Sequence, residues 1–182
     1  MKIRLVPVVE IYGDNAGLVA PAEHPAWAHP GPLDAYHEQR LRNAGYEPGL
    51  KPWLGGTSFY DLAEIAEPNL ERLVLVHTKG LRTGEYTLDQ CCGLSGGFVL
   101  QVDGIDKFFP QCCGELSDII YWERLSEGVE SYCEGHPAPY VFVQGDQVKM
   151  DFTVEESDES FQPTPPETIL LLDRKALAGA VA

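Results

Sequence analysis

The feature that most constrains the fold is a pair of short apolar segments joined by an Asp-Gly dipeptide. Residues 98–102 and 105–109 are rich in aliphatic and aromatic side chains, and Asp103 and Gly104 separate them. An Asp-Gly pair readily adopts the positive φ angles of a two-residue hairpin turn. This stretch therefore predicts two antiparallel strands.

A similar pattern occurs once more, near the C-terminal end of the chain. Residues 140–144 and 147–154 flank Gly145 and Asp146, which predicts a second hairpin. Helices and strands alternate without the regular period of a parallel fold, and the length suits one domain. We therefore expect a single α+β domain over residues 1–182, with mainly antiparallel β-hairpins packed against several short helices.

Two stretches are expected to be loops, and the segment after the first one is expected to be a helix. The first loop covers about residues 13–32 and is rich in proline, which is poorly tolerated inside helices and central strands. Pro32 suits the first turn of a helix over residues 33–44. The second loop covers about residues 155–167 and is acidic.

Capping residues indicate further short helices. Thr57 or Ser58 is expected to cap a helix that reaches Ile65, and Asn69 to cap another. The apolar run at residues 73–78 is equally compatible with a strand, because a short apolar segment fits either structure.

Charge gives the first indication of function. The net charge is −15, yet residues 1–60 contribute only −1, so nearly all the excess lies after Tyr60. Such a chain disfavours nucleic acid and favours a basic protein partner. The candidate partner-binding residues are the acidic start of a helix expected near residues 115–126 and a later acidic cluster: Glu115, Asp118, Asp151, Glu155, Glu156, Asp158 and Glu159.

The sequence also predicts a cytoplasmic protein that does not enter a membrane. No apolar run approaches the roughly 18 to 20 residues of a membrane helix, and Pro7 and Glu10 interrupt the N-terminal segment where a signal peptide would be apolar. The five cysteines are an odd number, which a secreted disulfide framework seldom leaves.

The most unusual motif is Gln-Cys-Cys-Gly, which occurs at residues 90–93 and again at 111–114. The two copies flank the first expected hairpin, so strand pairing would bring them together. Their cysteines, with two residues farther along the chain, form the candidate metal-binding set: Cys91, Cys92, Cys112, Cys113, Cys133 and His136.

Three interpretations of these cysteines stay open. The leading one is packing, because cysteine is among the most buried residue types, and it requires no cofactor. The second is a zinc site, although adjacent cysteines lack the usual spacing and point to opposite faces of an extended chain. The third is thiol chemistry, either catalysis or a vicinal redox pair.

The absence of familiar catalytic motifs favours a binding protein over an enzyme. The chain contains no Gly-x-Ser-x-Gly and no His-Glu-x-x-His sequence, and the glycine-rich residues 93–97 match no phosphate-binding loop. We assign no catalytic residue. Trp53 is expected either to anchor a loop or to contact a ligand. The resulting hypothesis is a cytosolic binding protein, in its most specific form an immunity protein that neutralises a bacterial toxin; the alternative is a cysteine-based metal-binding or thiol-redox protein.

Overall fold

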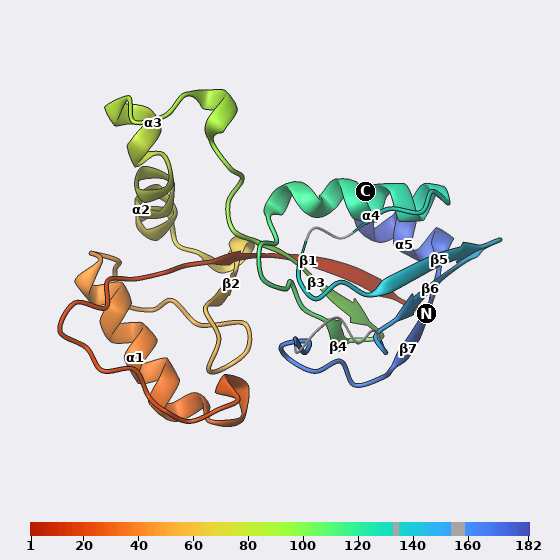
Figure 1. Cartoon of the computed structure of the whole chain (residues 1–182), viewed down its shortest axis with the longest axis horizontal. Coiled ribbons are helices and arrows are strands. Elements are labelled where there is room, and N and C mark those ends of the chain that lie inside the picture. Colours follow the sequence, from red (N-terminus) through yellow and green to blue (C-terminus); the bar gives the residue numbers. More distant parts are fainter. Residues whose placement is uncertain (133–134, 154–158) are drawn as a thin grey trace. The chain divides into compact units, whose positions relative to one another are not determined.

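The structure is a computed structural model that describes residues 1–132, 135–153 and 159–182, and it confirms the α+β class (Figure 1). One sheet has the strand order β2-β1-β3-β4 and the other β5-β6-β7. The strands are β1 (Ile3–Glu10), β2 (Phe59–Asp61), β3 (Gly96–Val102), β4 (Ile105–Phe108), β5 (Tyr140–Gln144), β6 (Gln147–Asp151) and β7 (Ile169–Asp173). The helices of the described residues include α1 (Pro30–Asn43), α2 (Glu67–His77), α3 (Lys79–Thr83), α4 (Ile119–Glu127) and α5 (Arg174–Val181).

The chain forms two compact units. Unit 1 comprises Met1–Pro7 and Ser95–Ala182, and unit 2 comprises Val8–Leu94. Each unit buries its own set of apolar side chains. The expected single-domain organisation stays a prediction.

Both expected hairpins are confirmed in unit 1. β3 pairs with β4 in antiparallel register, and Asp103 and Gly104 adopt φ angles of 51° and 82° at the turn. β5 pairs with β6 around Gly145, whose φ is 58°. The hydrogen-bonded turn geometry therefore follows from residues that tolerate positive φ.

β7 and the last two helices complete unit 1. β7 pairs with β6, and Asp173 then caps α5 by accepting a hydrogen bond from the Ala176 backbone N–H. α4 ends at Gly128, which adopts the left-handed conformation common after helices. α4 and α5 are in contact with each other.

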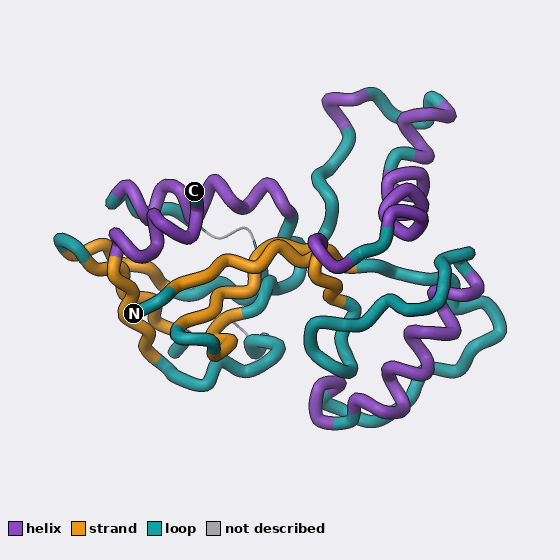
Figure 2. The backbone as a smooth tube through the Cα atoms, turned by 180° about the vertical axis from the view of Figure 1, so that it is seen from behind, coloured by secondary structure: helices purple, strands orange, loops and turns teal. Residues whose placement is uncertain are grey.

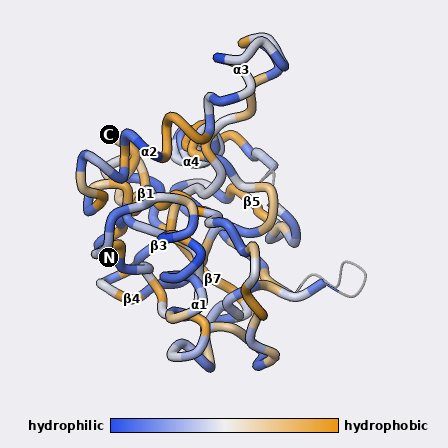
Figure 3. The backbone as a smooth tube through the Cα atoms, turned by 90° about the vertical axis from the view of Figure 1, so that its left-hand side faces the viewer, coloured by the Kyte–Doolittle hydropathy of each residue, from blue (hydrophilic) through white to orange (hydrophobic). Residues whose placement is uncertain are grey.

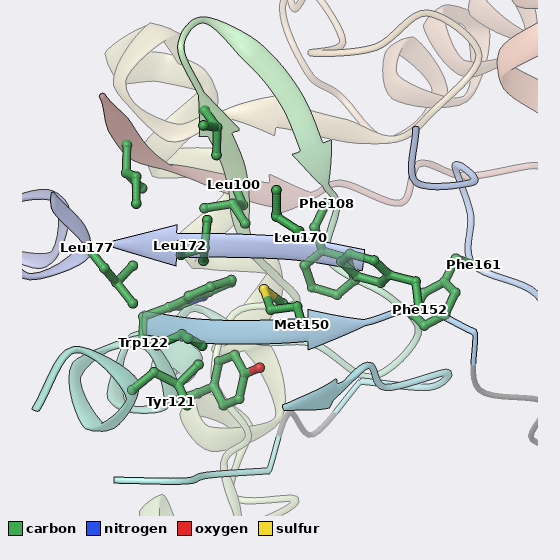
Figure 4. Packing of buried hydrophobic residues seen from close by; sticks show 14 residues of the cluster. Leu100, Phe108, Tyr121, Trp122, Met150, Phe152, Phe161, Leu170, Leu172 and Leu177 are labelled. Carbon is green, nitrogen blue, oxygen red and sulfur yellow. The ribbon is translucent and has the colours of Figure 1, made fainter. Parts of the chain in front are cut away.

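The core of unit 1 lies between its strands and these two helices. Figure 4 shows side chains from β6 and β7 lying among side chains from β3, β4 and α4. The labelled members are Leu100, Phe108, Tyr121, Trp122, Met150, Phe152, Phe161, Leu170, Leu172 and Leu177. Three of them, Phe108, Phe152 and Phe161, form an aromatic cluster with ring centroids 5.4–6.1 Å apart.

The boundary between the proline-rich loop and α1 in unit 2 differs from expectation. α1 begins at Pro30, so the proline-rich loop is shorter than residues 13–32 and also contains the single 3₁₀ turn Ala26–Ala28. Proline is favoured in the first turn of a helix because its missing N–H has no partner there in any case. Pro30 occupies that place, two residues before the expected Pro32.

The helix expected from Thr57 or Ser58 to Ile65 is wrong. This segment contains β2, which pairs with β1, and then the 3₁₀ turn Leu62–Glu64. Asp61 caps that turn by accepting from the Ala63 backbone N–H. Strand pairing at residues distant in sequence overrides the local capping preference.

α2 confirms the helical alternative for the apolar run at residues 73–78, but Asn69 does not cap it. Asn69 lies inside the helix and is buried. Its side chain accepts a hydrogen bond from the Glu47 N–H and donates one to the Glu47 carbonyl. The Asn69 side chain therefore holds the loop that contains Glu47 instead of capping the helix. Figure 2 distinguishes the loops of the chain from its helices and strands.

Candidate interaction surface and cysteine pairs

One face of the β5-β6-β7 sheet is exposed, and we call it the outer sheet face. Strand register places its residues in three rows, because side chains alternate between the faces of a strand. The rows are Tyr140, Asp151 and Ile169, then Phe142, Lys149 and Leu171, and finally the polar row Gln144, Gln147 and Asp173. The opposite face packs into the core of unit 1.

The first two rows of the outer sheet face are unusually apolar for a surface exposed to water, whereas the third row is polar. Tyr140, Phe142, Ile169 and Leu171 are 44–57% exposed. In β7, all four residues of the run 169–172 are apolar; Figure 3 colours the backbone by hydropathy. A strand with one solvated face normally alternates apolar and polar residues, so β7 has the composition of a strand covered on both faces.

A charged pair lies between the two apolar edges of this face. The Lys149 Nζ atom is 3.2 Å from an Asp151 carboxylate oxygen and 5.6 Å from the centre of the Phe142 ring. The Thr153 hydroxyl and backbone N–H also donate to Asp151. These hydrogen bonds, followed by Lys149, hold the pKa of the Asp151 carboxyl below its usual value.

The other predicted partner-binding residues are dispersed. The Glu115 N–H donates to the Asp118 carboxylate, and Glu115 itself accepts from Ser117, so these two acids cap the start of the segment that leads into α4. Glu159 is exposed. Glu155, Glu156 and Asp158 lie outside the described residues. Of the described candidates, Asp151 is the one on the outer sheet face.

The second cysteine pair lies at the surface of unit 1. Cys112 and Cys113 are exposed, and their Sγ atoms are 3.5 Å apart. Cys112 pairs with His136 in an isolated antiparallel bridge, through a bond of 2.9 Å from the His136 N–H to the Cys112 carbonyl. The leading interpretation, packing in a core layer, is therefore wrong for this pair.

The first cysteine pair, in unit 2, is arranged differently. The Cys91 Sγ atom is 3.9 Å from His77 Nε2 and 3.5 Å from the Cys92 carbonyl oxygen. His77 Nε2 is 2.9 Å from the same oxygen, so this nitrogen carries the proton that it donates. Cys91 is half-buried and Cys92 is exposed, so core packing is wrong here too.

The two pairs belong to different units, and Cys133 lies outside the described residues. Across residues 1–132, 135–153 and 159–182, no three His, Cys, Asp or Glu side chains are grouped as metal ligands. The described residues therefore provide no ligand set for the zinc alternative.

Unit 2 also contains a pocket that the sequence did not indicate, except through Trp53. Its volume is about 410 Å³, within the range of small-molecule sites. Its lining includes the half-buried Trp53 and the buried Tyr60, beside the charged Lys51, Asp61 and Glu64. Burial raises the pKa of Tyr60 to about 12, and the Asp34 carboxylate adds to this effect.

The outer sheet face was missed at the sequence level, although a signal for it was present. Four consecutive apolar residues at 169–172 mark a strand that is apolar on both faces.

Among the described residues, none of the helices has the length and apolar composition that a membrane span requires. Comparison with protein-family models, curated proteins and solved structures gave no match to this chain.

Proposed function

We propose that this chain is a non-enzymatic binding protein that recognises a basic protein partner through the outer sheet face. The observation that carries the proposal is the composition of this face: four exposed, large apolar side chains around a Lys149–Asp151 ion pair. Exposed apolar clusters of this kind are typical of protein interaction sites. Covering them would release their water, which drives association.

Charge supports a basic occupant. The strands of the outer sheet face lie within residues 128–182, which contain ten acidic and three basic residues. Two of the three basic side chains are engaged within the chain: Lys149 pairs with Asp151, and Arg174 donates to the Ser126 and Gly145 carbonyls. This excess of acidic residues in the sequence favours a cationic protein and would speed its approach. An immunity protein that neutralises a cationic toxin is the most specific form of this proposal.

The test is a defined binding reaction. Proteins encoded next to the gene of this chain, and proteins captured from a lysate of its source, are purified and titrated against the chain. We expect a basic partner whose affinity falls as salt is raised. Phe142→Ser and Leu171→Ser should each weaken binding about tenfold or more, as expected for central apolar contacts.

The matched control is Ile105→Ser, at an apolar side chain of β4 that is 57% exposed and lies outside the outer sheet face. It should leave the affinity unchanged. Binding to an acidic partner, affinity that is independent of salt, or equal losses in all three variants would each overturn the proposal.

A further inference from the structure

The Gln111-Cys112-Cys113-Gly114 segment is a tight turn that places two thiols side by side. The Gly114 N–H donates to the Gln111 carbonyl at 3.1 Å, which closes a four-residue turn with the cysteines at its two central positions. Cys113 has a φ of 70°, the left-handed conformation that a type II turn requires at its third residue. In an extended chain neighbouring side chains point to opposite faces, and this turn removes that obstacle.

The rest of unit 1 holds the turn in place. The Gly96 N–H donates to the Gly114 carbonyl, and the His136 N–H donates to the Cys112 carbonyl. A Cβ atom on Gly114 would lie 2.7 Å from the Gly96 carbonyl oxygen, so glycine is required for this close approach.

The buried Gln111 side chain also holds the turn through hydrogen bonds. It is 7% exposed, and its side-chain amide donates to the Phe109, Pro110 and Gln162 carbonyls. The Gln162 N–H donates in return to the Gln111 side-chain oxygen. The two sulfur atoms therefore lie close together at the surface, and hydrogen bonds from several segments hold the backbone that carries them.

We propose that Cys112 and Cys113 form a thiol–disulfide exchange site that reacts with small-molecule disulfides and closes to a reversible vicinal disulfide. Their Sγ atoms, now 3.5 Å apart, need to approach to the bonded distance of about 2.05 Å. Adjacent Cα atoms are about 3.8 Å apart, below the usual separation of about 4.4–6.8 Å across a disulfide. A strained and exposed disulfide is of the labile, easily reduced kind.

The reaction has two exchange steps. First, one cysteine loses its proton and its sulfur attacks a disulfide R–S–S–R; the S–S bond breaks, and one RS⁻ leaves and takes up the proton. Second, the other cysteine loses its proton and attacks the sulfur of this mixed disulfide, and the second RS⁻ leaves and is protonated. The two cysteines together lose two hydrogen atoms, that is, two protons and two electrons, and the small-molecule disulfide is reduced to two thiols.

The first copy of the motif provides an internal comparison. Cys91 has extended backbone angles, with φ −80° and ψ 117°, and its sulfur lies against His77. We therefore expect the 91–92 pair to react with a disulfide without closing on itself. This inference is independent of the proposed binding function.

The test uses the full chain and oxidised glutathione as the probe. The native protein is equilibrated in buffers of graded glutathione and glutathione disulfide, quenched with acid, alkylated and digested with trypsin. The two pairs then separate, because residues 83–107 and 108–124 lie on different tryptic peptides. We expect the 108–124 peptide to lose two hydrogen atoms and both alkylation sites, with an oxidised fraction about tenfold higher than that of 83–107 at the same glutathione ratio.

The variants distinguish closure from simple modification. Cys112→Ser and Cys113→Ser should each leave a persistent glutathione adduct on the remaining cysteine, and the double variant Cys91→Ser with Cys92→Ser should leave closure intact. A 108–124 peptide that retains two alkylation sites at every ratio would overturn the proposal. So would a persistent glutathione adduct on it in the wild-type chain, or a cross-link to the peptide that contains Cys133.

Discussion

The same four residues, Gln-Cys-Cys-Gly, adopt two different conformations in this chain. At residues 111–114 they form a closed turn with a buried glutamine and two exposed sulfur atoms 3.5 Å apart. At residues 90–93 the glutamine is exposed and receives the Thr87 N–H, while the Cys91 sulfur lies against His77. The four residues are identical, so the difference comes from their neighbours. Local sequence alone does not determine whether adjacent thiols converge.

The largest expected effect concerns the two glutamines. Gln111→Ala should lower the free energy of unfolding by about 2 to 4 kcal/mol, because it removes several buried hydrogen bonds and leaves backbone groups unsatisfied. Gln90→Ala should cost about 0.5 to 1 kcal/mol, the usual cost of a lost exposed cap. Urea unfolding of both variants measures the two losses, and equal losses would show that the two copies are anchored alike.

The second prediction compares a buried tyrosine of unit 2 with an exposed tyrosine of unit 1 by their effect on the free energy of unfolding at alkaline pH. The pKa of Tyr60 is raised to about 12 in the folded chain, from an ordinary value of 10. Its stabilising contribution is therefore complete below pH 10 and is lost between pH 10 and 12, by about 2 to 3 kcal/mol. Tyr60→Phe should reduce the loss of unfolding free energy over this window by that amount.

Tyr132→Phe is the control for this prediction. It changes a tyrosine of unit 1 that is 95% exposed. We expect its unfolding free energy to fall between pH 10 and 12 as in the unmodified chain. If Tyr60→Phe behaved in the same way as Tyr132→Phe, burial of Tyr60 would not be the cause of the alkaline loss.

Glycine substitution should have opposite signs in the two copies. Cys113→Gly should raise the free energy of unfolding by about 0.5 kcal/mol, because glycine adopts a φ of 70° without the penalty that an L side chain meets. Cys91→Gly should lower it by about 0.5 to 1 kcal/mol, since Cys91 is extended and glycine loses more entropy on folding. Both are measured by urea unfolding under reducing conditions, and a loss in both variants would contradict the turn geometry.

The smallest expected effect is a titration beside the first copy. The Thr87 hydroxyl donates to Asp89 and is the main reason that the pKa of this carboxyl lies below its usual value. A lowered carboxyl pKa gives stability that is present above about pH 4 and is lost as pH falls through the folded-state pKa. Thr87→Val should raise the pKa of Asp89, observed by carboxyl-carbon NMR.

Thr153→Val is the counterpart in unit 1, where the Thr153 hydroxyl donates to Asp151. It should raise the pKa of Asp151 and leave that of Asp89 unchanged. A shift at both carboxyls in either variant would point to a general change of structure.

Much of the fold was predictable because its signals are local. The Asp103-Gly104 turn, the Gly128 helix end and the Asp173 cap are each fixed by the conformational or hydrogen-bonding preference of one or two residues. Prediction failed where a distant partner decides the outcome. β2 forms because it pairs with β1, and Asn69 is buried because Glu47 supplies its hydrogen bonds.

The candidate sites follow the same division. The sequence identified both cysteine pairs and Asp151, but it favoured burial for the cysteines and attributed partner binding to acidic residues alone. Packing was the reasonable expectation, since cysteine is usually buried. The outer sheet face emerged only when strand register aligned Phe142 with Lys149 and Leu171, residues from three separate strands.

The sequence by itself determined the α+β class, the hairpins and the net negative charge of residues 61–182. Turn preference and charge are properties of individual residues. The tertiary structure decided which face of β7 is exposed and which cysteine pair converges. Both outcomes depend on hydrogen bonds between segments far apart in the chain: strand pairing across β5, β6 and β7, and the bonds from Gly96, His136 and Gln162 that hold one copy of the motif in a turn. Nothing inside Gln-Cys-Cys-Gly encodes these bonds, so an identical sequence has two structures.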